Sequence, residues 1–90
     1  MSDFPLKLIH RSEDWYFTYM KIDFCKTLLG QERFKIASAD NYIRYFAKTE
    51  EHRAFANQII ADAENRIKQL SFELRALELK LKEVEKNDCH

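Results

Sequence analysis

The chain has 90 residues, of which 15 are Lys or Arg and 15 are Asp or Glu, and 46% are hydrophobic. These numbers describe one small domain without net charge. Its single Gly and single Pro fall far below the usual shares of about 7% and about 5%, which excludes a turn-rich sandwich, a collagen-like repeat and a flexible linker. The composition predicts a mostly helical chain.

Charge and cysteine content restrict the binding partners and the cellular compartment that we expect. Zero net charge removes the broad attraction on which non-specific nucleic-acid and anionic-membrane binders depend. Cys25 and Cys89 are too few for a disulfide scaffold, and the sequence shows neither a secretory leader pattern nor a long uninterrupted apolar run. We therefore expect a cytoplasmic protein with reduced thiols and no membrane contact.

The first elements expected are an arm and a helix. Residues 1–11 alternate loosely between apolar and polar residues, which is typical of an extended arm. Ser12 can cap a helix whose first turn carries two carboxylates. We expect this helix to stop at Gly30, because glycine readily adopts the left-handed conformation that closes a helix.

Residues 15–29 are apolar over an unusually wide arc. A helix of this kind is expected to be covered on two or more sides, whereas an ordinary surface helix has one apolar stripe. The many aromatic side chains also permit a strand, so the strand remains an alternative for this segment.

A long helix is expected in the second half of the chain. Residues 31–37 are interpreted as a connector, after which no Gly or Pro occurs from Ala39 to Lys86, which predicts one continuous rod. The alternative is a break near residues 48–52, where Thr49 could cap a fresh helix over residues 50–86. Residues 12–48 would then form an aromatic helical head, residues 49–86 the long helix and residues 87–90 a frayed tail.

The long helix has a heptad period. Apolar residues occupy both core positions of four successive heptads, which is typical of a coiled coil. These positions are Ile60, Ala63, Ile67, Leu70, Leu74, Leu77, Leu81 and Val84.

A helix over residues 13–29 would be about 26 Å long, at about 1.5 Å per residue, and could not cover this seam from end to end. We therefore predict that a second chain covers it, as a homodimer through the C-terminal helix in either orientation or as one copy with another protein. A broken, folded-back bundle is the alternative.

Catalytic patterns are absent from the sequence. One glycine cannot form a phosphate-binding loop, and adjacent carboxylates such as Glu13 and Asp14 point about 100° apart on a helix, so they do not converge on a substrate. The histidines and cysteines lack the short spacing of metal ligands, apart from the adjacent terminal pair Cys89 and His90, which we interpret as tail residues. We expect no enzyme activity, no metal and no cofactor.

These patterns predict an all-α protein, in which an aromatic-rich N-terminal helix or helical hairpin precedes the long C-terminal helix. A second apolar stripe, formed by Phe72, Ala76 and Leu79, lies away from the seam, and either a partner or the N-terminal arm of the same chain would cover it. We expect a small adaptor or inhibitor that occupies a surface of a larger protein through aromatic and apolar anchors. The candidate anchors are Phe72, Leu79, Trp15, Tyr16, Tyr42 and Tyr45.

The alternative function is nucleic-acid-associated regulation. One segment mixes basic and aromatic residues, so phosphate contacts and base stacking could occur together there. Its basic residues are Lys26, Arg33, Lys35, Arg44 and Lys48.

Overall fold

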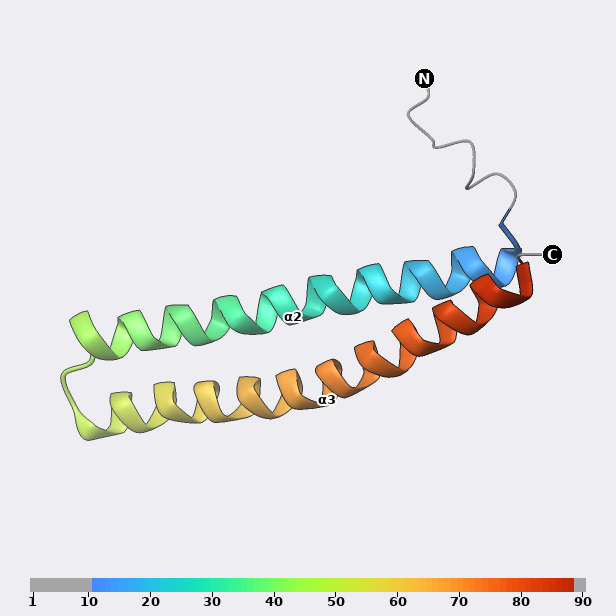
Figure 1. Ribbon diagram of the computed structural model, residues 1–90. Coiled ribbons are helices and arrows are strands. Elements are labelled where there is room, and N and C mark those ends of the chain that lie inside the picture. Colours follow the sequence, from blue (N-terminus) through green and yellow to red (C-terminus); the bar gives the residue numbers. More distant parts are fainter. Residues whose placement is uncertain (1–10, 89–90) are drawn as a thin grey trace, which may run out of the picture.

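The computed structural model describes residues 11–88 and shows a helical hairpin (Figure 1). Helix α2 spans Glu13–Tyr45 and helix α3 spans Glu50–Asp88. The two helices lie side by side and antiparallel, with their connecting loop at one end and the described chain ends at the other. The all-α prediction is confirmed, and the strand alternative for residues 15–29 is excluded because that segment lies within α2.

Both helices begin at capping hydroxyls. The Ser12 side chain accepts a hydrogen bond from the backbone N–H of Trp15 at 3.1 Å, as the sequence predicts. The Thr49 hydroxyl accepts one from the backbone N–H of His52, also at 3.1 Å. Two acidic residues follow each cap and compensate the positive end of the helix dipole.

The chain reverses at residues 46–49. The backbone N–H groups of Phe46 and Ala47 both donate to the carbonyl of Tyr42, at 2.9 and 2.8 Å, and so close the last turn of α2. The prediction of one continuous helix from Ala39 to Lys86 is therefore wrong, and the alternative break beside Thr49 is confirmed.

The predicted helix stop at Gly30 is also wrong. Helix α2 continues through Gly30 and through the expected connector at residues 31–37, and no described glycine has a positive φ. Glycine costs only about 1 kcal/mol in a helix interior relative to alanine. Packing of the flanking turns against α3 can outweigh that cost, so one glycine without a following proline does not end the helix.

The residues of α2 that pack against α3 recur at intervals of alternately three and four residues. The buried residues of α2 are Trp15, Thr18, Ile22, Cys25, Leu29, Glu32 and Ala39. Along α3, Ala63 is buried and the other seven predicted seam residues are half-buried. A covering helix of 33 residues replaces the short one expected from the sequence, so the argument that a second chain must cover this seam no longer holds.

The buried core between the two helices is small. Four of its eight buried hydrophobic residues are alanines, and no large side chain among residues 11–88 is less than 2% exposed. Ten large hydrophobic side chains remain between 50% and 78% exposed. The expectation that the first helix is covered on several sides is therefore not met within one chain.

The predicted arm over residues 1–11 lies almost entirely outside the described residues, as do Cys89 and His90 of the predicted tail. Asn87 and Asp88 belong to α3, which extends two residues beyond its expected end at Lys86.

The position of Gly30 inside α2 generates a stability prediction. A Cβ built at Gly30 has nothing within 4 Å, so Gly30→Ala should stabilise the protein by roughly 0.5–1 kcal/mol because alanine loses less entropy in a helix. Urea unfolding followed by circular dichroism measures this change. The reverse substitution at exposed Ala37 of the same helix should cost a similar amount. Destabilisation by Gly30→Ala would contradict a continuous α2.

Candidate functional site

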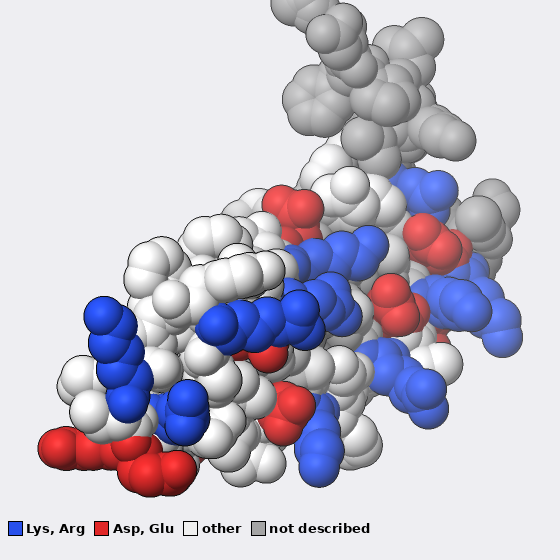
Figure 2. Space-filling view, turned by 90° about the vertical axis from the view of Figure 1, so that its left-hand side faces the viewer, with Lys and Arg blue, Asp and Glu red and all other residues white. Residues whose placement is uncertain are grey.

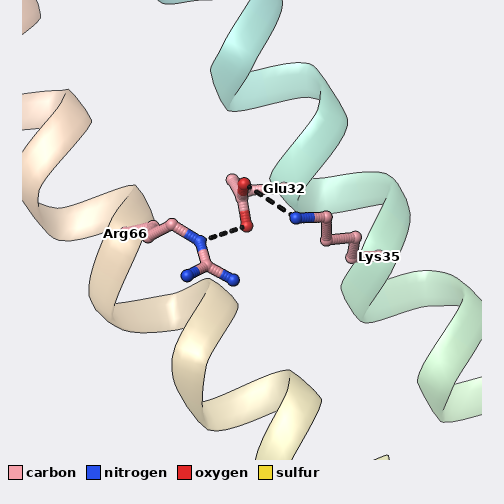
Figure 3. A network of polar contacts seen from close by, with 3 residues as sticks. All are labelled: Glu32, Lys35 and Arg66. Atoms are coloured by element: carbon pink, nitrogen blue, oxygen red, sulfur yellow. Dashed lines mark hydrogen bonds and ion pairs between the residues drawn. The ribbon is translucent and has the colours of Figure 1, made fainter.

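A carboxylate lies inside the contact between the helices. Glu32 is 7% exposed, and its two oxygens accept hydrogen bonds from Arg66 Nε of α3 at 3.1 Å and from Lys35 Nζ of α2 at 3.2 Å (Figure 3). The two cations approach Glu32 from different helices, so the carboxylate joins α2 to α3. A buried charge is tolerated only when it is paired and hydrogen-bonded, as Glu32 is.

The two cations also determine the protonation of this group. Burial alone raises the pKa of Glu32, but the hydrogen bonds from Arg66 and Lys35, together with their charges, outweigh it and lower the pKa below its ordinary value. Glu32 is therefore ionised at neutral pH. The network joins the two helices through Glu32, while the half-exposed side chains of Lys35 and Arg66 also reach the surface.

Two further hydrogen bonds join α2 to α3 along the hairpin. At the open end, Trp15 Nε1 donates to a Glu85 carboxylate oxygen at 3.0 Å. Further in, the buried Cys25 thiol donates to the carbonyl of Leu70 at 3.3 Å. Burial, and after it the negative charge of Glu73, raises the pKa of this thiol, so Cys25 stays protonated and is poorly suited to act as a nucleophile.

One side of the hairpin carries an apolar hollow near the loop. It has a volume of about 610 Å³ and is lined by residues of both helices. Phe34 and Phe55 are 72% and 68% exposed at its rim, whereas Ala39 and Ala56 form its floor, because their small side chains are buried. Its other lining residues are Lys35, Ser38, Tyr42 and Ile59.

A second hollow of about 270 Å³ lies nearer the open end and includes Phe24, Leu28 and Glu73 in its lining. Both hollows lie on the same side of the hairpin. Leu28, Lys35 and Tyr42 follow one another on α2 at intervals of seven residues, nearly two full turns, and Ile59, Arg66 and Glu73 do so on α3. We call this side the aromatic face. It comprises Phe17, Phe24, Leu28, Phe34, Tyr42, Phe55 and Ile59, with Lys35, Arg66 and Glu73 as a polar belt between its two ends. Phe17 is placed here by its seven-residue interval from Phe24 and by Lys21 of the second hollow, whose Nζ lies over the Phe17 ring.

The opposite side of the hairpin has another character. Its hollow is lined by the charged residues Arg33, Asp40 and Glu64, together with Ile36, Ala37 and Ile60. Seen from the loop end of the hairpin, Lys and Arg side chains are interspersed with Asp and Glu, beside an area of uncharged surface (Figure 2). The aromatic face is thus one of two unlike sides of a two-helix structure.

The structure separates the predicted anchor residues. Phe72, Leu79 and Tyr45 are exposed, Tyr16 and Tyr42 are half-buried, and Trp15 is only 6% exposed. Phe72 and Leu79 are 78% and 60% exposed on the outer side of α3, seven residues apart and away from the seam. Trp15 packs inside the open end of the hairpin, where it stacks on Tyr19 at 5.2 Å between ring centroids.

The predicted basic patch is divided between the two sides of the hairpin. Lys35 lines the hollow of the aromatic face, whereas Arg33 lines the opposite hollow. Lys35 is paired with Glu32, and Arg44 with Asp40 at 3.1 Å. Lys26 and Lys48 are exposed. Lys35 is therefore separated from Arg33, whereas Lys26 and Arg33, seven residues apart, lie on the same side of α2.

Sequence reasoning missed Phe17, Phe24 and Phe55 as surface residues and considered Phe34 only for base stacking beside the basic residues. The three-and-four spacing from Trp15 to Ala39 could have revealed them, because it defines the buried side of α2 and leaves Phe17, Phe24 and Phe34 outside. Two polar residues on the buried side, Thr18 and Glu32, concealed this spacing.

Within residues 11–88, no group of three or more His, Cys, Asp or Glu residues is placed to hold a metal ion. Neither described helix has the length and apolar character needed to cross a membrane.

The Glu32 network makes stability pH-dependent. Because the folded pKa is lowered, its contribution is complete at neutral pH, begins to decline near the ordinary glutamate pKa of about 4.3, and is lost as pH falls through the lowered pKa. Glu32→Gln should reduce the free energy of unfolding at pH 7 and flatten its decline below about pH 4.3. Urea unfolding at a series of pH values measures both effects. The same change at exposed Glu83 is the control, and an equal effect there would contradict the role of the network.

No protein-family model, curated protein or solved structure matches this chain.

Proposed function

We propose that this protein is a non-catalytic protein-interaction module, a small helical adaptor or inhibitor that works by occupying a surface of a larger protein. The observation that carries this proposal is the exposure of Phe72 and Leu79, 78% and 60%, on the outer side of α3, away from the seam. Soluble monomers rarely expose contiguous apolar areas of several hundred Å², and such areas mark interaction sites.

The surface proposed for the larger protein is the outer side of α3. Phe72 and Leu79 are more than half exposed there, although the seam of α3 against α2 lies on the other side of the helix. Ala76 lies between them in the sequence and is also exposed, so a partner could approach the α3 backbone closely. Phe72 and Leu79 can thus serve as anchors without a role in holding the hairpin together.

Charge favours a protein partner over a nucleic acid. The chain has no net charge, and its candidate basic residues lie on two sides of the hairpin, two of them paired with carboxylates. Nucleic-acid binding depends on several cations that contact one phosphate backbone. An amphipathic helix, by contrast, commonly binds a protein partner by placing its apolar face in a hydrophobic groove.

The experiment begins with copurification of the full chain from its source cells and identification of bound proteins by mass spectrometry. Binding of the purified target is then compared for the wild type and for Phe72→Ala with Leu79→Ala. Removal of two central anchors should raise Kd by at least about 30-fold, since an anchor contributes roughly 2 kcal/mol or more. Circular dichroism should show unchanged helicity, because both residues lie off the seam.

Arg44→Glu with Lys48→Glu serves as the matched control, and it should leave Kd for the protein target nearly unchanged. The nucleic-acid alternative predicts the reverse pattern. Oligonucleotide affinity would then fall steeply between about 50 and about 200 mM salt and would be weakened by the Arg44 and Lys48 changes. Such behaviour, with no effect of Phe72→Ala, would refute the proposed function.

A further inference from the structure

The aromatic face differs from the outer side of α3 in being built by both helices, and it is the larger of the two apolar surfaces. Its four phenylalanines are 54% (Phe17), 65% (Phe24), 72% (Phe34) and 68% (Phe55) exposed. If a large aromatic side chain offers about 200 Å², these four expose roughly 500 Å². Half-buried Leu28, Tyr42 and Ile59 and the polar belt add to this area. The total approaches the about 800 Å² per partner of a standard stable interface.

The small core of the hairpin gives an independent reason for a partner on this face. A single seam that buries four alanines, Thr18 and Glu32 removes little apolar surface from water. Oligomerisation is one of the ways in which proteins with small cores gain stability. A second two-helix layer on the aromatic face would enlarge this core, because side chains between the layers of a four-helix bundle are covered from both sides.

We propose that a second copy of this chain packs on the aromatic face, in antiparallel orientation, to form a four-helix bundle. The charges of the polar belt select this occupant and this orientation. Arg66 and Glu73 lie seven residues apart on one side of α3. A two-fold axis that passes beside Gln69, midway between them, brings Glu73 of each copy opposite Arg66 of the other.

The same axis also brings apolar side chains of α2 in one copy opposite apolar side chains of α2 in the other. Arg66 is level with Glu32, to which it donates a hydrogen bond. Glu73 is level with Cys25, because its negative charge acts on the pKa of that thiol. Gln69, between Arg66 and Glu73, is therefore level with residues 28–29 of α2. Phe24 and Phe34 then lie about 7–8 Å on either side of the axis, at about 1.5 Å per residue. Phe24 of one copy therefore meets Phe34 of the other, at the rim of the large apolar hollow.

The parallel alternative is disfavoured by charge. With both loops at the same end, α2 of one copy would lie over α3 of the other. Lys35 would then face Arg66 at the same level, because both residues bind Glu32. Like charges so placed repel, whereas the antiparallel arrangement pairs Arg66 with Glu73 twice. Lys21 also lines this face, but its Nζ lies over the Phe17 ring, one turn further from the axis, and so points away from Lys35 of the second copy.

Size-exclusion chromatography with light scattering on the full chain tests the assembly. At micromolar concentration the wild type should have twice the chain mass of 10.8 kDa. Phe24→Glu should weaken the dimer at least tenfold, because it buries a charge against Phe34 of the second copy. Phe72→Glu changes a residue that is equally exposed but lies on the outer side of α3, and it should leave the mass unchanged.

A crosslinking experiment tests the orientation and remains informative if Phe24→Glu fails to fold. In a Cys89→Ser background, Gln69→Cys places two thiols beside the two-fold axis, and a short bismaleimide should join the two copies. Exposed Lys68, one position away and about 100° around the helix, provides the control, and Lys68→Cys should crosslink at least tenfold less.

Three results would overturn the inference. The first is a wild-type mass of one chain, and the second is equal loss of the dimer in the Phe24 and Phe72 variants. The third is a dimer in which Gln69→Cys does not crosslink, which would exclude the antiparallel arrangement. A monomer that dimerises only when residues 1–10 are deleted would assign the face to that segment of the chain. None of these results bears on target binding through Phe72 and Leu79, so the proposed function and this inference can fail separately.

Discussion

The carboxylate of Glu32 has to be neutralised inside the contact between α2 and α3, and the rest of the hairpin depends on how this is achieved. Its two cations come from different helices, Lys35 from α2 and Arg66 from α3. Sliding α3 by one turn would move the guanidinium about 5.4 Å and leave a buried charge with half of its partners. Apolar side chains tolerate such a shift far better, because burial of apolar area is not directional. The network therefore fixes the register of the hairpin together with the short loop at residues 46–49 and the hydrogen bond from Trp15 to Glu85.

That register decides which surface residues become neighbours. It places Phe55 and Ile59 of α3 beside Phe34 and Tyr42 of α2, and so creates the apolar hollow near the loop. It also places Arg66 in the polar belt between the two ends of the aromatic face. The group that orders the interior thus positions the charges through which a second copy would be recognised.

Two helices share only one seam, and here that seam is narrow. Alanines at its loop half allow close packing but bury little area, and the large aromatic side chains lie mostly outside it. The resulting molecule has two separate apolar surfaces, the aromatic face and the outer side of α3. In our proposals the first completes the fold by pairing two copies, and the second stays available for a larger protein.

The sequence by itself determined the helical class, the capping hydroxyl of Ser12 and which side of α3 is covered, whereas it offered Thr49 only as the cap of the alternative, broken helix. These features depend on local chemistry and on a period within one helix, such as Ser12 before two carboxylates or the apolar heptads from Ile60 to Val84. The exposure of Phe72 and Leu79 follows from the same period.

Only the tertiary structure decided that α2 continues past Gly30, that α3 folds back on α2, and that Phe24, Phe34 and Phe55 share one face with Ile59. The cost of a glycine in a helix is about 1 kcal/mol, and whether the chain tolerates it depends on packing by a distant segment. Likewise, the aromatic face is formed by residues of two helices, whose proximity depends on the chain reversal at residues 46–49 and on contacts such as the pairing of Glu32 with Arg66. No local pattern specifies that pairing, because a buried glutamate interrupts the apolar spacing by which α2 would otherwise have been identified.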